Sequence, residues 1–148
     1  MSDIVQQMGD HHRYCDDLFV AAEQAARTGD MAACCRQVAD FAAALEQHLT
    51  LEEQQLFPRF EQATGMTAGP TAVMRMEHEQ MRELVAQMQA AAERDDADAM
   101  LGAADTLLIL MQQHNLKEEN VLYPMMNRVL AGQCDELLKA LHGEGGGV

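Results

Sequence analysis

Residues 48–58 read His48-Leu-Thr-Leu-Glu52-Glu-Gln-Gln-Leu-Phe-Pro58, and residues 114–124 read His114-Asn-Leu-Lys-Glu118-Glu-Asn-Val-Leu-Tyr-Pro124. The shift of 66 residues that superimposes these stretches also places His12 on His78, so residue types, spacing and flanking apolar residues all repeat. A unit of this length that occurs only twice is not a solenoid array. It predicts two half-structures that face each other across a shared site.

The composition favours a single helical domain. The chain has 148 residues, of which 48% are hydrophobic and 23% charged, as in a globular protein. Only 4% of the residues are aromatic, and Trp is absent. Ala, Leu, Met, Gln and Glu are abundant instead, and these residues favour helices over strands.

Charge and hydropathy exclude several classes of partner. The chain carries 10 Lys and Arg against 24 Asp and Glu, and the net charge of -14 repels nucleic acids and anionic lipid surfaces. No run of 18 apolar residues and no signal-like N-terminal segment occurs. The four cysteines lack the spacing of a zinc site or a disulfide framework, which favours reduced thiols. We therefore expect a cytoplasmic protein without a nucleic-acid or membrane partner.

Four segments have helical periodicity and are separated by short turn signals. They run from about Asp10 (or Ile4, if the repeat extends that far) to Arg27, Asp30 to Gln62, Pro70 to Glu93, and Ala97 to Leu130. Asp30 and the pair Asp95-Asp96 are expected N-caps. Pro58 and Pro124 should each kink the helix or end its regular hydrogen bonding just beyond the repeated His and Glu residues. This order predicts an all-α, antiparallel up-down-up-down four-helix bundle.

The expected bundle comprises residues 1–132. Residues 133–148 should form a C-terminal extension, with a short helix followed by a disordered glycine-rich tail.

The repeated His and Glu residues have the spacing of metal ligands. A separation of four residues places His48 above Glu52 on one helix face, about 6 Å apart along the axis. This face is otherwise apolar, and a buried carboxylate requires a cation or counter-ion. The alternative for a single inward histidine is a hydrogen-bonded core residue, but the duplication favours a metal site.

The number of donors favours two metal ions over one. Six side chains around one ion would fill an octahedron and leave no position for chemistry. If both glutamates bridge two ions, each ion receives two His nitrogens and two carboxylate oxygens. A bridging oxo or hydroxo group then leaves one open position per ion. This donor set suits Fe, Mn or Zn.

The residues resemble the hemerythrin-like, or HHE cation-binding, domain family from about Asp10 to Leu130. The resemblance implies a non-haem di-iron centre held by His12, His48, Glu52, His78, His114 and Glu118. The repeat selects His12 rather than its neighbour His11. Met74 stands where oxygen-carrying hemerythrins have an additional histidine, and the set of four His and two Glu is more similar to bacterial iron-centre repair proteins.

Three functions are compatible with this interpretation. The first is a di-iron protein that binds dioxygen, nitric oxide or peroxide for sensing, detoxification or iron handling. The second is an enzyme that reduces nitric oxide or peroxide, or repairs iron centres, with a reductase or an iron-acceptor protein as partner. The third is a structural, metal-filled bundle.

The remaining polar residues near these motifs are given lesser roles. Glu53 and Glu119 are expected to be solvated or to support the ligands from outside. Tyr14 and Tyr123 are expected to point away from the site, and His11 and His142 to be exposed. Cys15 is expected to be a buried apolar residue that lines the same cavity.

Overall fold

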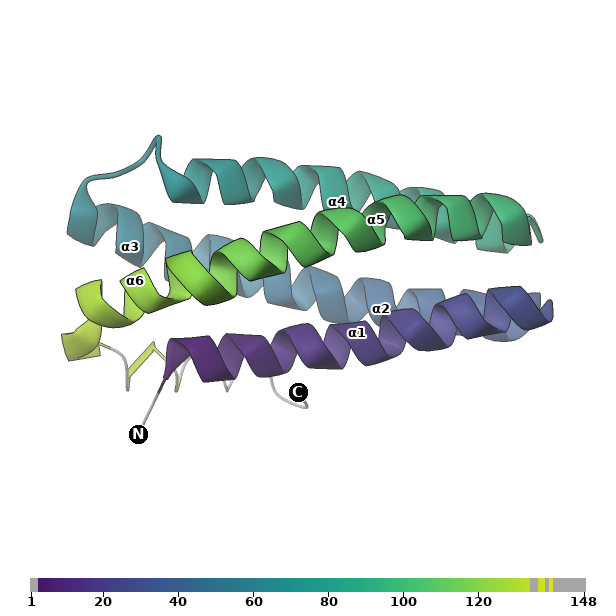
Figure 1. Cartoon of the computed structure of the whole chain (residues 1–148), viewed down its shortest axis with the longest axis horizontal. Coiled ribbons are helices and arrows are strands. Elements are labelled where there is room, and N and C mark those ends of the chain that lie inside the picture. Colours follow the sequence, from purple (N-terminus) through teal and green to yellow (C-terminus); the bar gives the residue numbers. More distant parts are fainter. Residues whose placement is uncertain (1–2, 134–135, 138, 140–148) are drawn as a thin grey trace.

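Four long helices form an antiparallel bundle in the computed structural model, which describes residues 3–133 together with residues 136, 137 and 139 (Figure 1). The helices in chain order are α1 (Ile4–Thr28), α2 (Met31–Leu51), η1 (Glu52–Leu56), α3 (Phe57–Thr64), α4 (Pro70–Glu93), α5 (Ala97–Lys117), η2 (Glu118–Leu122), α6 (Tyr123–Val129) and η3 (Ala131–Gln133). The segments α2, η1 and α3 follow one another without a break, as do α5, η2 and α6. The predicted all-α four-helix bundle is therefore confirmed.

Local capping residues define most helix ends. The carboxylates of Asp30 and Asp96 accept hydrogen bonds from the backbone N–H of the third residue beyond them, at 3.1 and 3.0 Å, as predicted. Gly29 and Gly65 terminate helices in the left-handed conformation, with φ of 80° and 72°. The first helix begins at Ile4, as the repeat indicates, and not at Asp10.

The second and the fourth long helix of the bundle each contain one π-helical turn, at the same place in the repeat. The turns η1 and η2 begin at Glu52 and Glu118, and both end two residues before a proline, Pro58 or Pro124. Because proline has no N–H, it cannot donate the next α-helical hydrogen bond. The helices continue past the prolines as α3 and α6 through this local change in hydrogen bonding, which is a π-bulge in each case.

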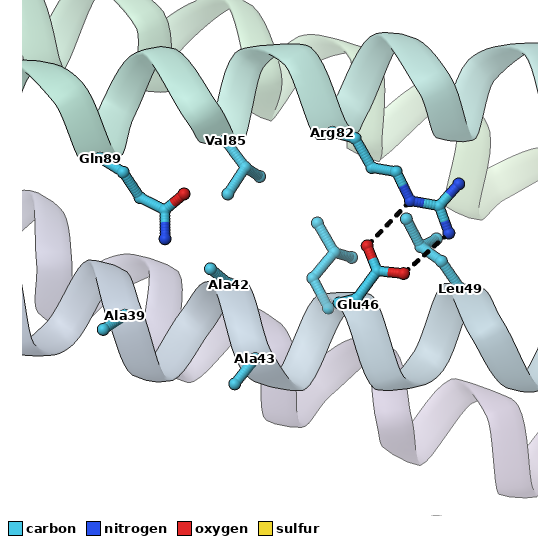
Figure 2. Close-up of a pocket in the computed structure, with 9 residues that line it drawn as sticks. Ala39, Ala42, Ala43, Glu46, Leu49, Arg82, Val85 and Gln89 are labelled. Carbon is cyan, nitrogen blue, oxygen red and sulfur yellow. Dashed lines mark hydrogen bonds and ion pairs between the residues drawn. The ribbon is translucent and has the colours of Figure 1, made fainter.

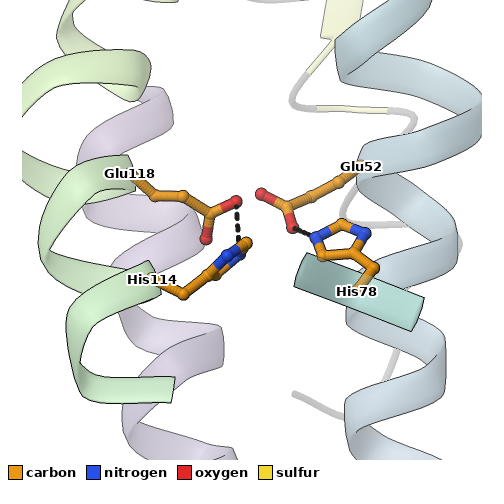
Figure 3. Close-up of side chains that lie close together, drawn as sticks. All are labelled: Glu52, His78, His114 and Glu118. Carbon is orange, nitrogen blue, oxygen red and sulfur yellow. Dashed lines mark ion pairs between the residues drawn. The ribbon is translucent and has the colours of Figure 1, made fainter. Parts of the chain in front are cut away.

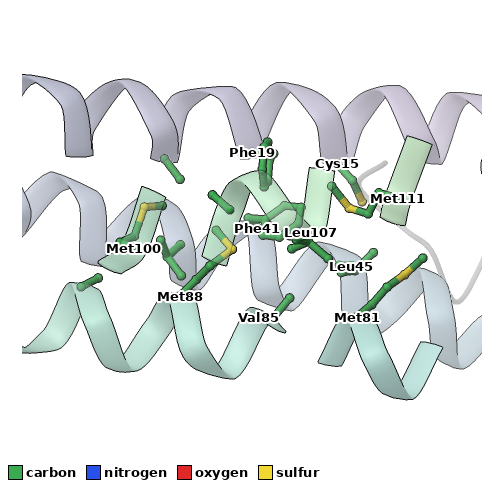
Figure 4. Packing of buried hydrophobic residues seen from close by; sticks show 14 of the residues in the cluster. Cys15, Phe19, Phe41, Leu45, Met81, Val85, Met88, Met100, Leu107 and Met111 are labelled. Atoms are coloured by element: carbon green, nitrogen blue, oxygen red, sulfur yellow. The ribbon is translucent and has the colours of Figure 1, made fainter. Parts of the chain in front are cut away.

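Two apolar clusters lie on either side of the repeated motifs. One contains Cys15, Phe19, Phe41 and Met88 and fills the end of the bundle around the α4–α5 turn (Figure 4). The other contains Ile4, Met8, Phe57, Phe60 and Met126 and fills the opposite end. Along each helix the expected ligands come between the two clusters, so they form a polar layer inside an otherwise apolar core.

The C-terminal extension at residues 133–148 lies almost entirely outside the described residues, and its predicted helix and tail stay predictions. His142 falls in the same region. Within the described part of the chain, no helix has the length and apolar character needed to cross a membrane.

Candidate metal centre

All six predicted ligands meet in the polar layer of the bundle. His12 comes from α1, His48 from α2, His78 from α4 and His114 from α5, while Glu52 and Glu118 begin the two π-helical turns. Figure 3 shows Glu52 and Glu118 reaching toward each other, with His78 and His114 beside them. None of the six side chains is more than 5% exposed.

The inward-facing atoms of these side chains approach one another without hydrogen bonds. His78 Nε2 lies 3.1 Å and His48 Nε2 lies 3.5 Å from Glu52 Oε1, while His114 Nε2 lies 3.2 Å from Glu118 Oε2. Each of these five buried atoms lacks a hydrogen-bond partner. Buried polar atoms are normally paired, so five orphans around one centre need another explanation.

A metal ion provides that explanation. The ligand atoms form two groups in which all members lie within 4.8 Å of one another: Glu52, His78, His114 and Glu118, and His12, His48 and Glu118. Imidazole nitrogens and carboxylate oxygens are ligands of Fe, Mn and Zn. The donor set and the orphaned atoms therefore fit a metal site.

The outer nitrogen of each histidine contacts a second side chain. His12 Nδ1 lies 2.6 Å from Glu119, and His78 Nδ1 lies 2.7 Å from Glu53. Such carboxylates orient an imidazole so that its other nitrogen faces a metal. Glu53 and Glu119 thus support the ligands from outside, one of the two roles expected for them.

The outer contacts of the other two histidines differ from each other. His114 Nδ1 lies 2.8 Å from Glu77, whereas His48 Nδ1 lies 3.3 Å from the Nδ1 of His11. Glu77 and His11 occupy the same position in the repeat. Three of the four histidines are therefore backed by a carboxylate and the fourth by an imidazole.

Three of the histidines bind protons more tightly than usual. Burial by itself lowers the pKa of His114, but the close contact with Glu118 and the charges of Glu118 and Glu52 outweigh burial and raise this pKa to about 9. The pKa values of His12 and His78 are also raised, because their carboxylate partners outweigh burial. In the metal-free protein, the protons on these three histidines therefore occupy positions that a metal ion would take.

His48 is the exception. Burial lowers the pKa of His48 well below its usual value, and the charge of Glu52 only partly offsets this effect. His48 is therefore neutral at pH 7.

The two central glutamates differ in their affinity for a proton, and Tyr123 connects them. Burial and the nearby Glu118 raise the pKa of Glu52. Burial also opposes ionisation of Glu118, but its close contacts with Glu52, His114 and His12 outweigh burial and lower that pKa. The Tyr123 hydroxyl lies 2.7 Å from Glu52 Oε2 and 2.8 Å from Glu118 Oε1. In the metal-free protein, hydrogen bonds therefore connect the buried carboxyl groups of Glu52 and Glu118 through the Tyr123 hydroxyl.

The expectation that Tyr123 points away from the site is wrong. Tyr123 is fully buried, and its hydroxyl also lies 3.3 Å from His12 Nε2. In a regular α-helix, a residue five positions after Glu118 would face elsewhere. The π-helical turn bonds the Tyr123 N–H to the Glu118 carbonyl and brings the two residues to the same side. The sequence signal for this turn is Pro124.

The expectation that His11 is exposed is also wrong, since its side chain is 3% exposed. Helix α1 packs against α2 on one side and against α5 and η2 on another, so adjacent residues on α1 can both be buried. His11 faces His48 on α2, whereas His12 faces Glu118 and Glu119. The supporting role of Glu77 was missed as well, although its position in the repeat, opposite His11, was a usable signal.

Cys15 is buried, as expected, and lines a small cavity with His11 and His48. Burial raises the pKa of its thiol to about 12. A neutral thiol is a poor nucleophile and a poor metal ligand, so Cys15 acts as a packing residue.

Comparison with known proteins agrees with this geometry. The family described as "Hemerythrin HHE cation binding domain" matches residues 3–126. The iron-sulfur cluster repair protein YtfE of Enterobacter sp. (strain 638) is 31% identical over 144 residues, which cover 88% of this chain and 64% of the relative. The YtfE protein of Salmonella schwarzengrund (strain CVM19633) is 33% identical over 98 residues, or 60% of this chain and 43% of the relative. No solved structure matches.

The chain therefore belongs to the hemerythrin HHE cation binding domain family. It is a metal-binding bundle of this family, and it spans less than two thirds of the length of the curated relatives it matches.

Proposed function

We propose that this member of the HHE family is a non-haem di-iron protein that binds a small ligand, such as dioxygen, nitric oxide or peroxide, for sensing, detoxification or iron handling. The observation that carries the proposal is the group of five orphaned ligand atoms, buried at the meeting point of the two repeats. A cation at this point would satisfy them, as the family description "cation binding" suggests.

The clusters of ligand atoms support two metal positions. His78 and His114 would hold one iron ion, and His12 and His48 would hold the other. Glu118 belongs to both clusters, and Glu52 Oε1 approaches a histidine of each pair, so both glutamates are placed to be shared. Each ion would thus receive two imidazoles and oxygens from shared carboxylates, which leaves coordination positions free for a ligand.

When bound, iron in such a site supplies a Lewis-acidic, redox-active position for a diatomic or peroxide molecule. The protein supplies the surroundings. Met8 and Met74, 0% and 3% exposed, exclude water from one side of the layer. The Tyr123 hydroxyl keeps its proton, because burial and the charges of Glu118 and Glu52 raise its pKa well above the usual value. Tyr123 can therefore donate a hydrogen bond beside the His12 position.

Metal analysis and gas-binding kinetics test this function. After iron-replete expression, we expect about two irons per chain and a visible charge-transfer band in air. Stopped-flow mixing of the reduced protein with dioxygen, nitric oxide and peroxide should give ligand adducts. Less than one iron per chain, with no visible band, would rule the proposal out.

Repair of iron centres is the second candidate, since the matched relatives are named iron-sulfur cluster repair proteins. It would require an iron-acceptor protein, and a catalytic reduction would require a reductase. Transfer of ⁵⁷Fe from the loaded protein to an apo iron-sulfur protein would favour this candidate over stable ligand binding. Cys15, Cys34 and Cys35 are free thiols, which supports a reducing compartment such as the cytoplasm for either function.

A structural metal site is the third candidate. Metal removal should then lower the unfolding temperature, while the loaded protein shows no reaction with any of the three ligands.

A further inference from the structure

Two surface grooves are related by the same repeat as the metal ligands. One groove, of about 460 Å³, lies between α2 and α4, and the other, of about 650 Å³, lies between α1 and α5. A shift of 66 residues superimposes much of their linings, and the matching pairs are Arg82 with Asp16, Val85 with Phe19, Gln89 with Glu23, Leu45 with Met111, Glu46 with Gln112, and Leu49 with Asn115. The places where the two grooves differ are therefore informative.

Arg82 lines the groove between α2 and α4. Its guanidinium donates to both oxygens of Glu46, at 2.8 and 3.0 Å (Figure 2), and to both oxygens of Glu53, at 2.9 Å each. Glu53 is the carboxylate that orients His78. This clamp fixes Glu53, which orients His78, and places a guanidinium cation in the wall of the groove.

The groove between α1 and α5 has no such clamp at the equivalent positions. Asp16 replaces Arg82, and Gln112 replaces Glu46. Glu119, which contacts the outer nitrogen of His12, lines this groove and is 36% exposed, against 21% for Glu53. The lining of this surface groove therefore includes three carboxylates, those of Asp16, Glu23 and Glu119, and the last of them contacts His12.

The outer contacts of His48 and His114 also distinguish the two metal positions, because only His114 is supported by a carboxylate. Glu77, which supports His114, is 13% exposed and is held by Lys117 at 2.5 Å. The equivalent contact of His48 is an imidazole, that of His11, and not a carboxylate. Outer carboxylates raise the basicity of a ligand histidine, and losing one lowers metal affinity by about 10- to 100-fold.

We propose that the two metal positions are inequivalent: the position at His78 and His114 binds a divalent cation first and holds it, whereas the position at His12 and His48 exchanges its cation through the α1–α5 groove. The inference rests on the proposed two-metal function. Asp16 and Glu119 attract a cation toward the groove, which speeds both access and exchange. The Nε2 of His48, which is buried without a hydrogen-bond partner, is one of the ligand atoms of this second position.

Loading with one equivalent of metal tests the order of binding. We expect crystals of the metal-free protein grown with one equivalent of Co²⁺ or Zn²⁺ to show anomalous density at His78 and His114, and at most a tenth of that occupancy at His12 and His48. Equal occupancy, or preference for His12 and His48, would overturn the inference. Failure of a second equivalent to bind anywhere would overturn the two-metal function itself.

Building the Arg82–Glu46 ion pair into the α1–α5 groove tests whether the cation exchanges through that groove. Removal of metal from the fully loaded protein by a chelator should have a fast and a slow phase of equal amplitude. The double variant Asp16→Arg, Gln112→Glu should slow the fast phase by about tenfold or more, because it builds the Arg82–Glu46 pair into the α1–α5 groove. The converse variant Glu46→Gln should speed the slow phase.

The variant Asp17→Arg provides a control, since it repeats the Asp16→Arg substitution at an exposed neighbour outside the groove lining. It should leave both phases unchanged. A single removal phase in the wild type, or equal slowing by Asp16→Arg, Gln112→Glu and by Asp17→Arg, would contradict the proposed route. If the clamp variant does not fold, the Glu46→Gln result and the one-equivalent map still decide the question.

Discussion

At the residue scale, the protonation of His114 connects metal binding to pH. Its pKa of about 9 means that the metal-free protein carries a proton there at pH 7, and a metal must displace that proton from Nε2. Metal affinity should therefore rise between pH 6.5 and 8.5. A competitive titration with Co²⁺ and a chelator measures this dependence, and an affinity that is flat or falls with pH would contradict the assignment of His114.

The raised pKa of His114 also predicts that the stability of the metal-free protein falls as the pH rises, whereas its metal affinity increases. The pKa of His114 is higher in the folded state than its usual value of 6.5. Its contribution to stability is therefore fully present below about pH 6.5 and is lost as the pH rises through 9. Thermal unfolding should show a decline over this range that is smaller in the variant His114→Gln.

Tyr123→Phe removes the hydroxyl that bridges the two buried carboxylates. Phenylalanine fits the position, because Phe57 occupies the equivalent place in the other repeat and stacks on His78. We expect the metal-free protein to lose about 1.5–3 kcal/mol of unfolding free energy, since hydrogen bonds to charged groups contribute about this much. The control Tyr14→Phe, at a side chain 41% exposed, should change little in denaturant unfolding.

At the element scale, caps and turns explain why helix boundaries could be predicted and π-helical turns could not. Asp30 and Asp96 act through local hydrogen bonds that depend only on neighbouring residues. The π-helical turns have only proline as a local signal, and proline also predicts a kink or a helix end. The position of Tyr123 depends on that choice, and so its role was not predictable from α-helical spacing.

The cap at Asp96 gives a test of local stability. Asp96→Ala removes the acceptor of the Ala99 N–H and should lower the unfolding free energy by about 1 kcal/mol. Denaturant unfolding measures this loss, and the metal content should not change, because the cap lies at the end of α5 remote in sequence from His114. Asp105→Ala, an exposed position within α5, serves as the control that should cause no loss.

At the scale of the whole molecule, the repeat determined most of what could be predicted. It identified all six ligand candidates and the antiparallel pairing, because residues with equal spacing on facing helices reach the same layer. It could not identify the contacts that break the symmetry, such as His11 with His48. Those contacts depend on how α1 is rotated between its two neighbours, which the spacing along the chain does not define.

Metal removal should destabilise the whole bundle. The polar layer lies between two apolar clusters, so orphaned atoms there weaken the centre of the molecule. A metal that binds only the folded protein stabilises it in proportion to the logarithm of its concentration over the dissociation constant. Chelation should therefore lower the unfolding temperature at constant helicity, and restored metal should reverse the change. An unchanged transition would argue that metal binding is not coupled to folding.

The central claim is that six side chains from two repeats hold two iron ions. Anomalous diffraction at the iron edge, from crystals of the iron-replete protein, tests it most directly. The account predicts two iron peaks, one bonded to His12 and His48, the other to His78 and His114, with Glu52 and Glu118 shared between them. A single peak, or iron bound by other residues, would contradict it.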